Sequence, residues 1–399
     1  MPYTEQTRTL PVRGTYDVVV AGGGIAGVAA AIAAARCGRS VCLIEKEYAL
    51  GGLATLGLVV VYLPICDGRG RKVCGGLAEE LLLLSAAENA GTIPSCWQRD
   101  ADQAERRKHR YRVEYNPASL MLSLEKLIGE HSVKLFYDTR CCAVIRSEDD
   151  HSVSAVVVEN KDGRGAVECR AIVDATGDAD ICALAGEPTV SLATNCAAGW
   201  YYSLVDSQPK LHKLSEPFDP AGATMLPGAG RGYAGDVADD VTAHVLASRQ
   251  LIRDHQAQLR SERATDTIVP FLIPSFPGFR MTRRLCGAIE VDAVDRKEYP
   301  DNIGLIPDWR RDGPVYSIPL RAIRGVRNRN LLVAGRCVSA VGRGWDMTRA
   351  IPSCVVTGEA AGIAGAMIAA AGTAEALEAA ELQTQLRGGG NRIFLSELE

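Results

Sequence analysis

A chain of 399 residues with 47% hydrophobic and 23% charged residues has the composition of a soluble globular protein and room for two domains. Its net charge of -4 argues against a nucleic acid or an anionic membrane surface as partner. We expect a cytoplasmic protein, because the first 14 residues lack a signal-peptide core and the apolar stretches look too short or interrupted to span a bilayer.

The 13 cysteines are scattered, and no Cys-x-x-Cys pair or Cys/His cluster has the spacing of a zinc or iron–sulfur site. Several of them sit inside apolar runs, where a reduced thiol behaves as a small hydrophobic side chain. We therefore expect free thiols and no metal site.

A complete strand–turn–helix–strand unit opens the chain. An apolar strand at residues 18–21 leads into Gly22, Gly24 and Gly27, followed by an alanine-rich helix at 28–36 and a strand from 41 that ends at Glu45. In this motif the first glycine allows a tight turn, the second lets a pyrophosphate approach the backbone, and the third lets the helix pack close to the strand. The acid hydrogen-bonds a ribose and disfavours a 2′-phosphate, so the unit predicts a dinucleotide site that is not for NADP.

The next elements alternate in the manner of an α/β fold. A glycine loop occupies residues 50–58, helices are expected at 77–85 and 118–130, and strands at 133–136, 141–146, 153–159 and 169–175. Asn116 and Pro117 mark the start of the second helix.

From residue 187 to 313 the pattern becomes irregular, apart from a helix at 236–260, and we predict a second, substrate-facing region inserted here. Strands at 315–323 and 330–334 and a long helix at 353–371 return to the first fold, and the tail after Gln383 is expected to be mobile. The predicted division is a discontinuous dinucleotide-binding domain, 1–186 and 314–399, with a substrate or capping domain at 187–313.

No second strand–glycine–helix unit is found, while a strand and a small-residue helix stand about 300 residues after the first glycine turn. A nicotinamide dehydrogenase usually ends in a substrate domain, whereas a flavoprotein of the glutathione-reductase type wraps its whole chain around the flavin. The order of elements favours this wrapping.

Five collinear segments carry a family resemblance, at residues 17–46, 51–59, 174–180, 280–287 and 316–365. On these segments the chain resembles the FAD-dependent oxidoreductases that are distantly related to the flavoprotein subunits of fumarate reductase and succinate dehydrogenase. The resemblance implies an α/β fold with a Rossmann-like FAD-binding domain of the glutathione-reductase type and an inserted, smaller α+β substrate domain.

The resemblance also implies which residues hold FAD. Gly22, Gly24 and Gly27 would line the pyrophosphate, Glu45 would hold the adenosine ribose, and the backbone near Ala143 would contact the adenine. Ala26 and Lys46 are expected contacts as well. Gly52, Leu53, Ala54 and Thr55 would lie along the ribityl chain and the flavin, and Ala175, Thr176, Gly177 and Asp178 would close over the nucleotide. Gly335 and Arg336 would meet the pyrophosphate or the ribityl chain. Ser353, at the start of the last helix, would lie at the flavin N1–C2=O edge, and Arg349 is a further expected contact.

An FAD-dependent enzyme that moves a hydride between a small organic substrate and flavin N5 needs cationic groups and a base or acid near the reacting carbon. The candidates are Arg280, Arg283, Arg343, Asp346 and Arg349. Two plainer readings remain, in which Arg283 anchors a domain interface or a phosphate and Arg349 is the ion-pair partner of Asp346.

The sequence leaves open two other functions, net non-redox chemistry through transient oxidation and nucleotide binding without catalysis. Expected partners are a small-molecule substrate and an electron acceptor or donor whose identity the sequence does not give. A homo-oligomer is left open.

Overall fold

The structure is a computed structural model that describes residues 3, 7–216, 230–263, 268–372 and 377–398. Its centre is a seven-stranded sheet in which five strands run parallel in the order β5–β2–β1–β8–β16. The buried, β-branched run at the end of β1 suits a strand covered on both faces. These strands are β1 (Val12–Ala21), β2 (Val41–Ile44), β5 (Lys134–Phe136), β8 (Gly163–Asp174) and β16 (Leu331–Val333).

The long strand β8 joins the parallel strands to an antiparallel extension. Its first half pairs with β7 (Val153–Asn160), which in turn pairs with β6 (Arg140–Arg146). The register between β6 and β7 shifts between Cys141 and Ala143, so Cys142 forms a bulge. The extra residue interrupts the alternation of the β6 side chains between the two faces of the sheet.

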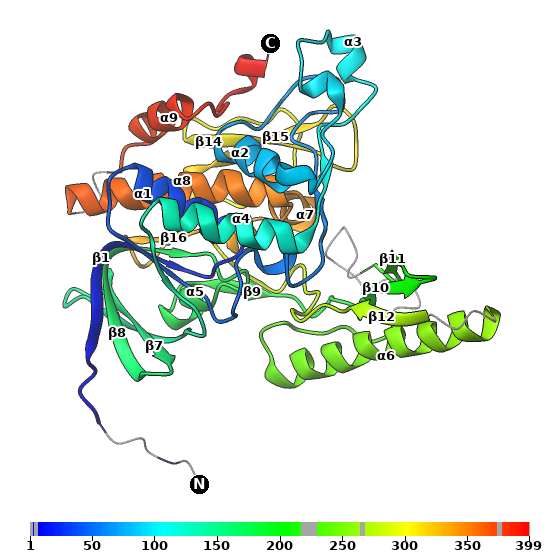
Figure 1. Ribbon diagram of the computed structural model, residues 1–399. Helices are drawn as coiled ribbons and strands as arrows, with labels where there is room; N and C mark the ends of the chain where they lie inside the picture. Colours follow the sequence, from blue (N-terminus) through cyan, green and yellow to red (C-terminus); the bar gives the residue numbers. More distant parts are fainter. Residues whose placement is uncertain (1–2, 4–6, 217–229, 264–267, 373–376, 399) are drawn as a thin grey trace.

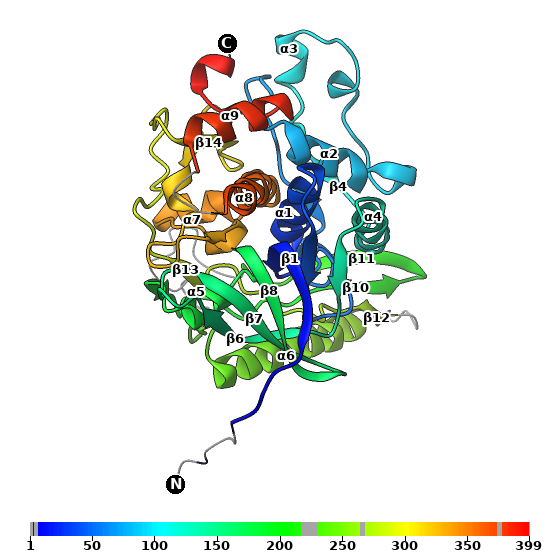
Figure 2. The ribbon, with the colours of Figure 1, turned by 90° about the vertical axis from the view of Figure 1, so that its left-hand side faces the viewer.

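Two helices from opposite ends of the chain lie together on one face of the sheet. They are α1 (Ile25–Arg36) and α8 (Ile351–Ala371), and both also contact β1 and β8 (Figures 1 and 2). Glycines make the contact close, because a Cβ on Gly358 would lie 2.3 Å from Ala26 O and one on Gly362 would lie 2.2 Å from Ala30 O. The closing helix therefore packs backbone to backbone against the opening helix.

The remaining helices surround this pair. α4 (Pro117–Glu130) and α2 (Gly76–Ser85) flank α1 and α8, and Asn116 caps α4 by accepting hydrogen bonds from Ala118 N and Ser119 N. α9 (Ala379–Gly388) packs on α8 with Leu386 buried, and Ile393 beyond it is also buried. The expected mobile tail is therefore wrong, because its apolar side chains dock on the body. Short helices are α3 (Gln103–Arg106), α5 (Asp180–Leu184) and α7 (Gly342–Thr348).

Helix α8 corrects one expectation drawn from the sequence. It begins two residues earlier than predicted and, by length and composition alone, is long and apolar enough to cross a membrane. However, 83% of its most apolar window is buried inside the protein, against α1 and the sheet. The helix thus has the position of a core helix, and its apolar surface is accounted for by packing.

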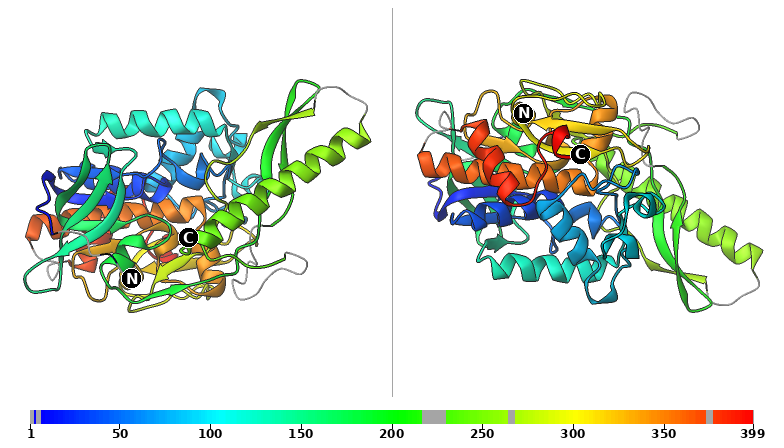
Figure 3. Two further views of the ribbon diagram at one scale, coloured as in Figure 1. Left: turned by 90° about the horizontal axis from the view of Figure 1, so that it is seen from below. Right: turned by 90° about the horizontal axis from the view of Figure 1, so that it is seen from above.

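A smaller unit projects to one side of this body (Figures 1 and 3). It consists of a three-stranded antiparallel sheet in the order β11–β10–β12 and the long helix α6 that contacts β12. Its elements are β10 (Trp200–Val205), β11 (Gln208–Lys213), α6 (Ala238–Glu262) and β12 (Ile268–Leu272). A mixed α+β unit inserted in a parallel-sheet fold was predicted, and the fold class is confirmed.

Other strands form separate two-stranded sheets, which lie in part within residues 187–313. They are β3 (Val61–Tyr62) with β4 (Val113–Glu114), β9 (Thr189–Ser191) with β13 (Arg283–Leu285), and β14 (Asn302–Pro307) with β15 (Val315–Pro319). β14 contacts α8 and so lies on the larger body, although it precedes residue 314. The domain boundaries stay a prediction, and residues 217–229 and 264–267 of that segment lie outside the described chain.

Candidate functional site

The turn between β1 and α1 shows why each of its glycines is needed. Gly22 has φ +100°, and a Cβ there would lie 2.5 Å from Ala175 O; a Cβ on Gly27 would lie 1.8 Å from Gly22 O. Both positions therefore exclude any side chain. Gly24 differs, because a Cβ there would meet nothing within 4 Å. The missing side chain at Gly24 leaves open space in front of the turn.

The first turn of α1 faces this space with free donors. Gly24 is its N-cap residue and no side chain caps the helix, so the early N–H groups are not satisfied within it. The helix dipole adds partial positive charge at this end. An uncapped helix start behind an open glycine is a binding site for a phosphate group.

Glu45 lies at the end of β2, beside the glycine turn. Its carboxylate accepts hydrogen bonds from Gly23 N (2.6 Å) and Glu47 N (2.8 Å) and is 6% exposed. Burial raises the pKa of this carboxyl, although the two backbone donors act in the opposite direction. The neighbouring Lys46 places its ammonium 5.3 Å from the centre of the Phe276 ring. The two bonds use only part of the capacity of the carboxylate, so a further donor can bind there.

The loop at residues 51–55 runs beside the glycine turn and is fixed to it by backbone. Gly51 N donates to Gly23 O (2.8 Å), and Thr55 Oγ1 donates to Leu50 O (2.6 Å). Gly51 has φ +98°, a conformation that favours glycine. The loop thereby presents Leu53 and Ala54 toward the same space as Gly24.

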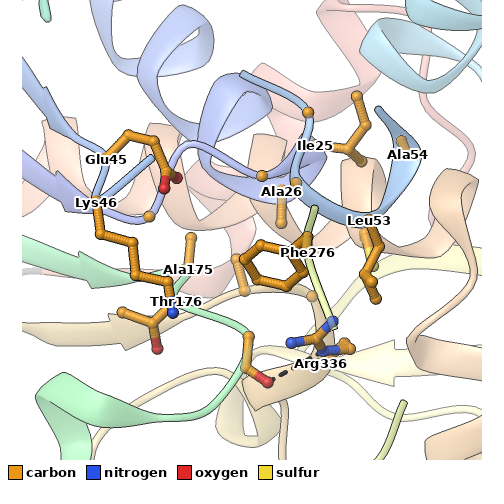
Figure 4. Close-up of a pocket in the computed structure, with 18 of the residues that line it drawn as sticks. Ile25, Ala26, Glu45, Lys46, Leu53, Ala54, Ala175, Thr176, Phe276 and Arg336 are labelled. Carbon is orange, nitrogen blue, oxygen red and sulfur yellow. Dashed lines mark hydrogen bonds between the residues drawn. The ribbon is translucent and has the colours of Figure 1, made fainter. Parts of the chain in front are cut away.

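Strand β8 ends at the opposite wall, where Ala175, Thr176 and Gly177 follow it. Arg336 Nε donates to Gly177 O (3.1 Å), and its Nη2 pairs with Asp178 (3.2 Å). Arg336 comes from the closing part of the chain, yet it lies across these residues (Figure 4). The neighbouring Gly335 has φ +68°, and a Cβ there would lie 2.9 Å from the Cβ of Ala26. The closing segment therefore touches the opening turn.

These segments enclose one elongated cavity of about 990 Å³, counting the part open to solvent. Glu45 and Lys46 lie at one side of the view in Figure 4, and Leu53, Ala54 and Arg336 at the other. An extended dinucleotide fits this shape, with its diphosphate at Gly24.

Most residues predicted to hold the cofactor line this cavity. They are Gly22, Gly24, Ala26, Glu45, Lys46, Gly52, Leu53, Ala54, Ala175, Thr176, Gly177, Gly335, Arg336 and Arg349. Five others do not line it. Gly27 and Thr55 support the turn and the loop, Asp178 holds Arg336, Ser353 is buried in α8, and Ala143 lies beyond the Cys142 bulge.

The cavity also has lining residues that the sequence did not single out as cofactor contacts. They are Ile25, Ile44, Thr139, Arg140, Cys141, Asp180, Phe276, Ala334, Ile351 and Cys354. Most lie within two residues of a predicted position, so the motifs could have indicated them. Phe276 is different, because it comes from an irregular loop of the inserted region, where Ser275 N and Phe276 N donate to Leu56 O (3.1 and 3.3 Å). No local pattern marks this contact.

The candidate catalytic residues are spread over several environments. Arg349 alone among them lines the cavity, and it pairs with the buried Asp346, which also accepts from Arg310 Nε (2.7 Å). Burial lowers the pKa of the Arg349 guanidinium, while Asp346 opposes that shift. Arg343 pairs with Asp308 (2.6 Å) and is 40% exposed in its side chain.

The other two cations belong to the inserted region. Arg283 donates to Asp178 O (2.9 Å) and pairs with Asp180 (2.7 Å), so it joins the inserted region to the segment after β8. This geometry matches the anchoring role that was considered for it. Arg280 is buried and lines a second, smaller cavity.

Several solved structures align with most of this chain but share little sequence identity with it. Mycobacterium smegmatis Sdh1 in the apo form is 15% identical, with 90% of this chain and 69% of that chain covered and a TM-score of 0.48. The p-nitrophenol 4-monooxygenase PnpA from Pseudomonas putida DLL-E4 is 12% identical, with 94% and 85% covered and a TM-score of 0.48. A point variant of the quinol fumarate reductase subunit FrdA of E. coli is 15% identical, with 94% and 74% covered and a TM-score of 0.47.

No curated protein sequence matches the chain at a significant level. The family model described as "FAD dependent oxidoreductase" matches residues 17–195 and 224–386, which is most of the chain and includes both the opening turn and the closing helix. The chain therefore belongs to the FAD-dependent oxidoreductase family and is a flavoenzyme whose cofactor is FAD.

Proposed function

We propose that this enzyme transfers a hydride between a small organic substrate and N5 of FAD, with FAD held in the large cavity. One observation carries the placement of FAD in this proposal: an open glycine, Gly24, stands between an uncapped helix start and the closing segment of the chain. A diphosphate needs this combination of close backbone approach, free N–H donors and positive dipole.

Each wall of the cavity has a role in this proposal. The N-terminal turn of α1 binds the diphosphate with its N–H groups, and Glu45 accepts hydrogen bonds from the adenosine ribose. Leu53 and Ala54 pack along the flavin end of the cavity, and Arg336 fixes the wall formed by Gly177. The start of α8 closes that end with Ile351 and Cys354.

FAD, when bound, supplies the acceptance or donation of a hydride at its N5 atom. The protein supplies positive charge near the flavin end of the cavity, from the Arg349 guanidinium and from the start of α8. No side chain caps α8, so the positive end of its dipole is available to negative charge that develops there. Asp346 keeps Arg349 in place and is a positioning residue, since each of its carboxylate oxygens is engaged by an arginine.

The test is a single added methyl group. Gly24 has ordinary extended backbone angles (φ -65°, ψ 176°) and open space at its Cβ, so Gly24→Ala should leave the FAD-free fold unchanged. The methyl group should nevertheless collide with the diphosphate and weaken FAD binding at least about tenfold, which is about 1.4 kcal/mol. FAD titration and urea unfolding of the FAD-free protein measure the two effects separately.

The matched control is Gly129→Ala in α4, where a Cβ also meets nothing within 4 Å and the residue is exposed. It should change neither FAD affinity nor absorption of the purified protein. Wild-type protein that neither purifies yellow nor takes up added FAD would end the proposal, and so would a Gly24→Ala variant that binds FAD as tightly as the wild type.

A further inference from the structure

A second cavity shares a wall with the first. It has a volume of about 470 Å³, counting the part open to solvent, and lies between α6, β10 and the loop at 274–278. Phe276 lines both cavities, and Gly57, which follows the Leu53–Ala54 turn, lines the second. The two spaces therefore share the Phe276 side chain.

Arg280 is the charged group buried in the second cavity. It is 5% exposed, its Nη1 donates to Gly278 O (2.9 Å), and its guanidinium lies over the Trp200 ring, 5.4 Å from the centroid. Within the described parts of the chain it forms no ion pair with a carboxylate, in contrast to Arg283, Arg336 and Arg349. A buried cation is costly unless an anion pairs with it.

The charge on Arg280 persists at neutral pH. Burial, together with the neighbouring cations Arg349 and Arg336, lowers its pKa to about 9, and Glu216 acts in the opposite direction. The guanidinium is thus still protonated at pH 7, in a position where neighbouring arginines add to the positive field. This field attracts an anion into the cavity.

His244 places a second buried polar group in the same cavity. Its Nε2 lies 3.0 Å from Cys196 O, so we assign the proton to Nε2 and a lone pair to Nδ1. The side chain is 1% exposed, and Nδ1 is buried with no hydrogen-bond partner in the described structure. Burial lowers the pKa of this imidazole to about 4, so it is neutral at pH 7 and offers a hydrogen-bond acceptor.

Resting on the proposed function, we propose that the second cavity is the substrate site and takes a small organic carboxylate, which binds to Arg280 while His244 Nδ1 accepts a hydrogen bond from a hydroxyl or amine of the same molecule. A guanidinium matches a carboxylate through two parallel hydrogen bonds. The bound acid then lies against Phe276, whose side chain also lines the cavity assigned to FAD.

The experiment compares three acids with their neutral amides: acetate with acetamide, lactate with lactamide, and benzoate with benzamide. Binding to the FAD-loaded protein is measured by calorimetry and by the change in the visible spectrum of the flavin. At least one acid should bind tenfold or more tightly than its amide at pH 7.

Arg280→Met should abolish the preference for the acid, and Arg280→Lys should retain part of it. The control is Arg253→Met, an exposed residue on α6 that lies outside the cavity and should leave the preference unchanged. If Arg280→Met does not fold, the lysine variant and the acid–amide comparison in the wild type decide the question.

The proposal is overturned if no acid binds better than its amide, if inorganic phosphate binds as tightly as the best acid, or if Arg280→Met keeps the preference. These results are distinct from a failure of the proposed function, because that failure appears as protein without FAD. Acid binding can also be measured by calorimetry on FAD-free protein.

Discussion

Gly358→Ala in α8 perturbs the contact between the two ends of the chain. The new Cβ would lie 2.3 Å from Ala26 O, about 1 Å inside the 3.4 Å at which ordinary contact begins. The obstructing atom is backbone, so α8 and α1 must move apart to accommodate it. Such overpacking costs about 1–3 kcal/mol, while alanine recovers about 1 kcal/mol of helix propensity over glycine. We expect a net loss of up to about 2 kcal/mol in the free energy of unfolding.

Gly365→Ala is the matched control in the same helix. There the nearest atom to the new Cβ is Val18 Cγ1 at 3.4 Å, an ordinary contact, so only the gain in helix propensity should be seen. The two variants should differ by about 1–3 kcal/mol, the overpacking cost alone, when both are unfolded in urea without FAD. Gly358→Ala should also purify with less FAD, because Ala26 lines the cavity. Equal stability of the two variants would refute the close packing of α1 and α8.

Two further predictions concern charges near the core. Glu359 in α8 is 5% exposed, and burial raises its pKa from 4.5 to about 7, so the wild type should lose up to about 3 kcal/mol of unfolding free energy as the pH rises from 4.5 to 7. Glu359→Gln should remove most of that dependence in urea unfolding at pH 5 and pH 8, and an unchanged dependence would contradict the assignment. Arg349→Met removes positive charge from the cavity and should make the flavin midpoint potential more negative by about 30 mV, which is about 1.4 kcal/mol for two electrons. An unaltered potential with FAD still bound would place Arg349 away from the flavin.

The opening of the chain was predictable because its chemistry is local. Gly22, Gly24 and Gly27 follow a buried strand and precede a helix, and each glycine has a steric reason that the structure shows directly. The family resemblance then indicated the fold, the wrapping of the chain and FAD. The closing helix was also recognisable, although its start was placed two residues too late.

The inserted region was less predictable because its contacts are long-range. Phe276 and His244 come from a loop and a helix whose local patterns carry no sign of a cavity. Long-range contacts bring them near Gly57, such as the hydrogen bonds from Ser275 N and Phe276 N to Leu56 O. The cavity is lined by Thr139, Arg140 and Cys141, while Ala143 lies beyond the bulge at Cys142. The tail was misjudged because its glycines suggested mobility while Ile393 is buried.

The most direct test of the account is amide hydrogen exchange, measured with and without added FAD. One FAD molecule bound between the two ends of the chain should slow exchange in the opening turn (residues 22–27). At the same FAD concentration, it should also slow exchange at residues 335–336 and at the start of α8. Protection confined to the opening turn, with the closing segment unchanged, would contradict it.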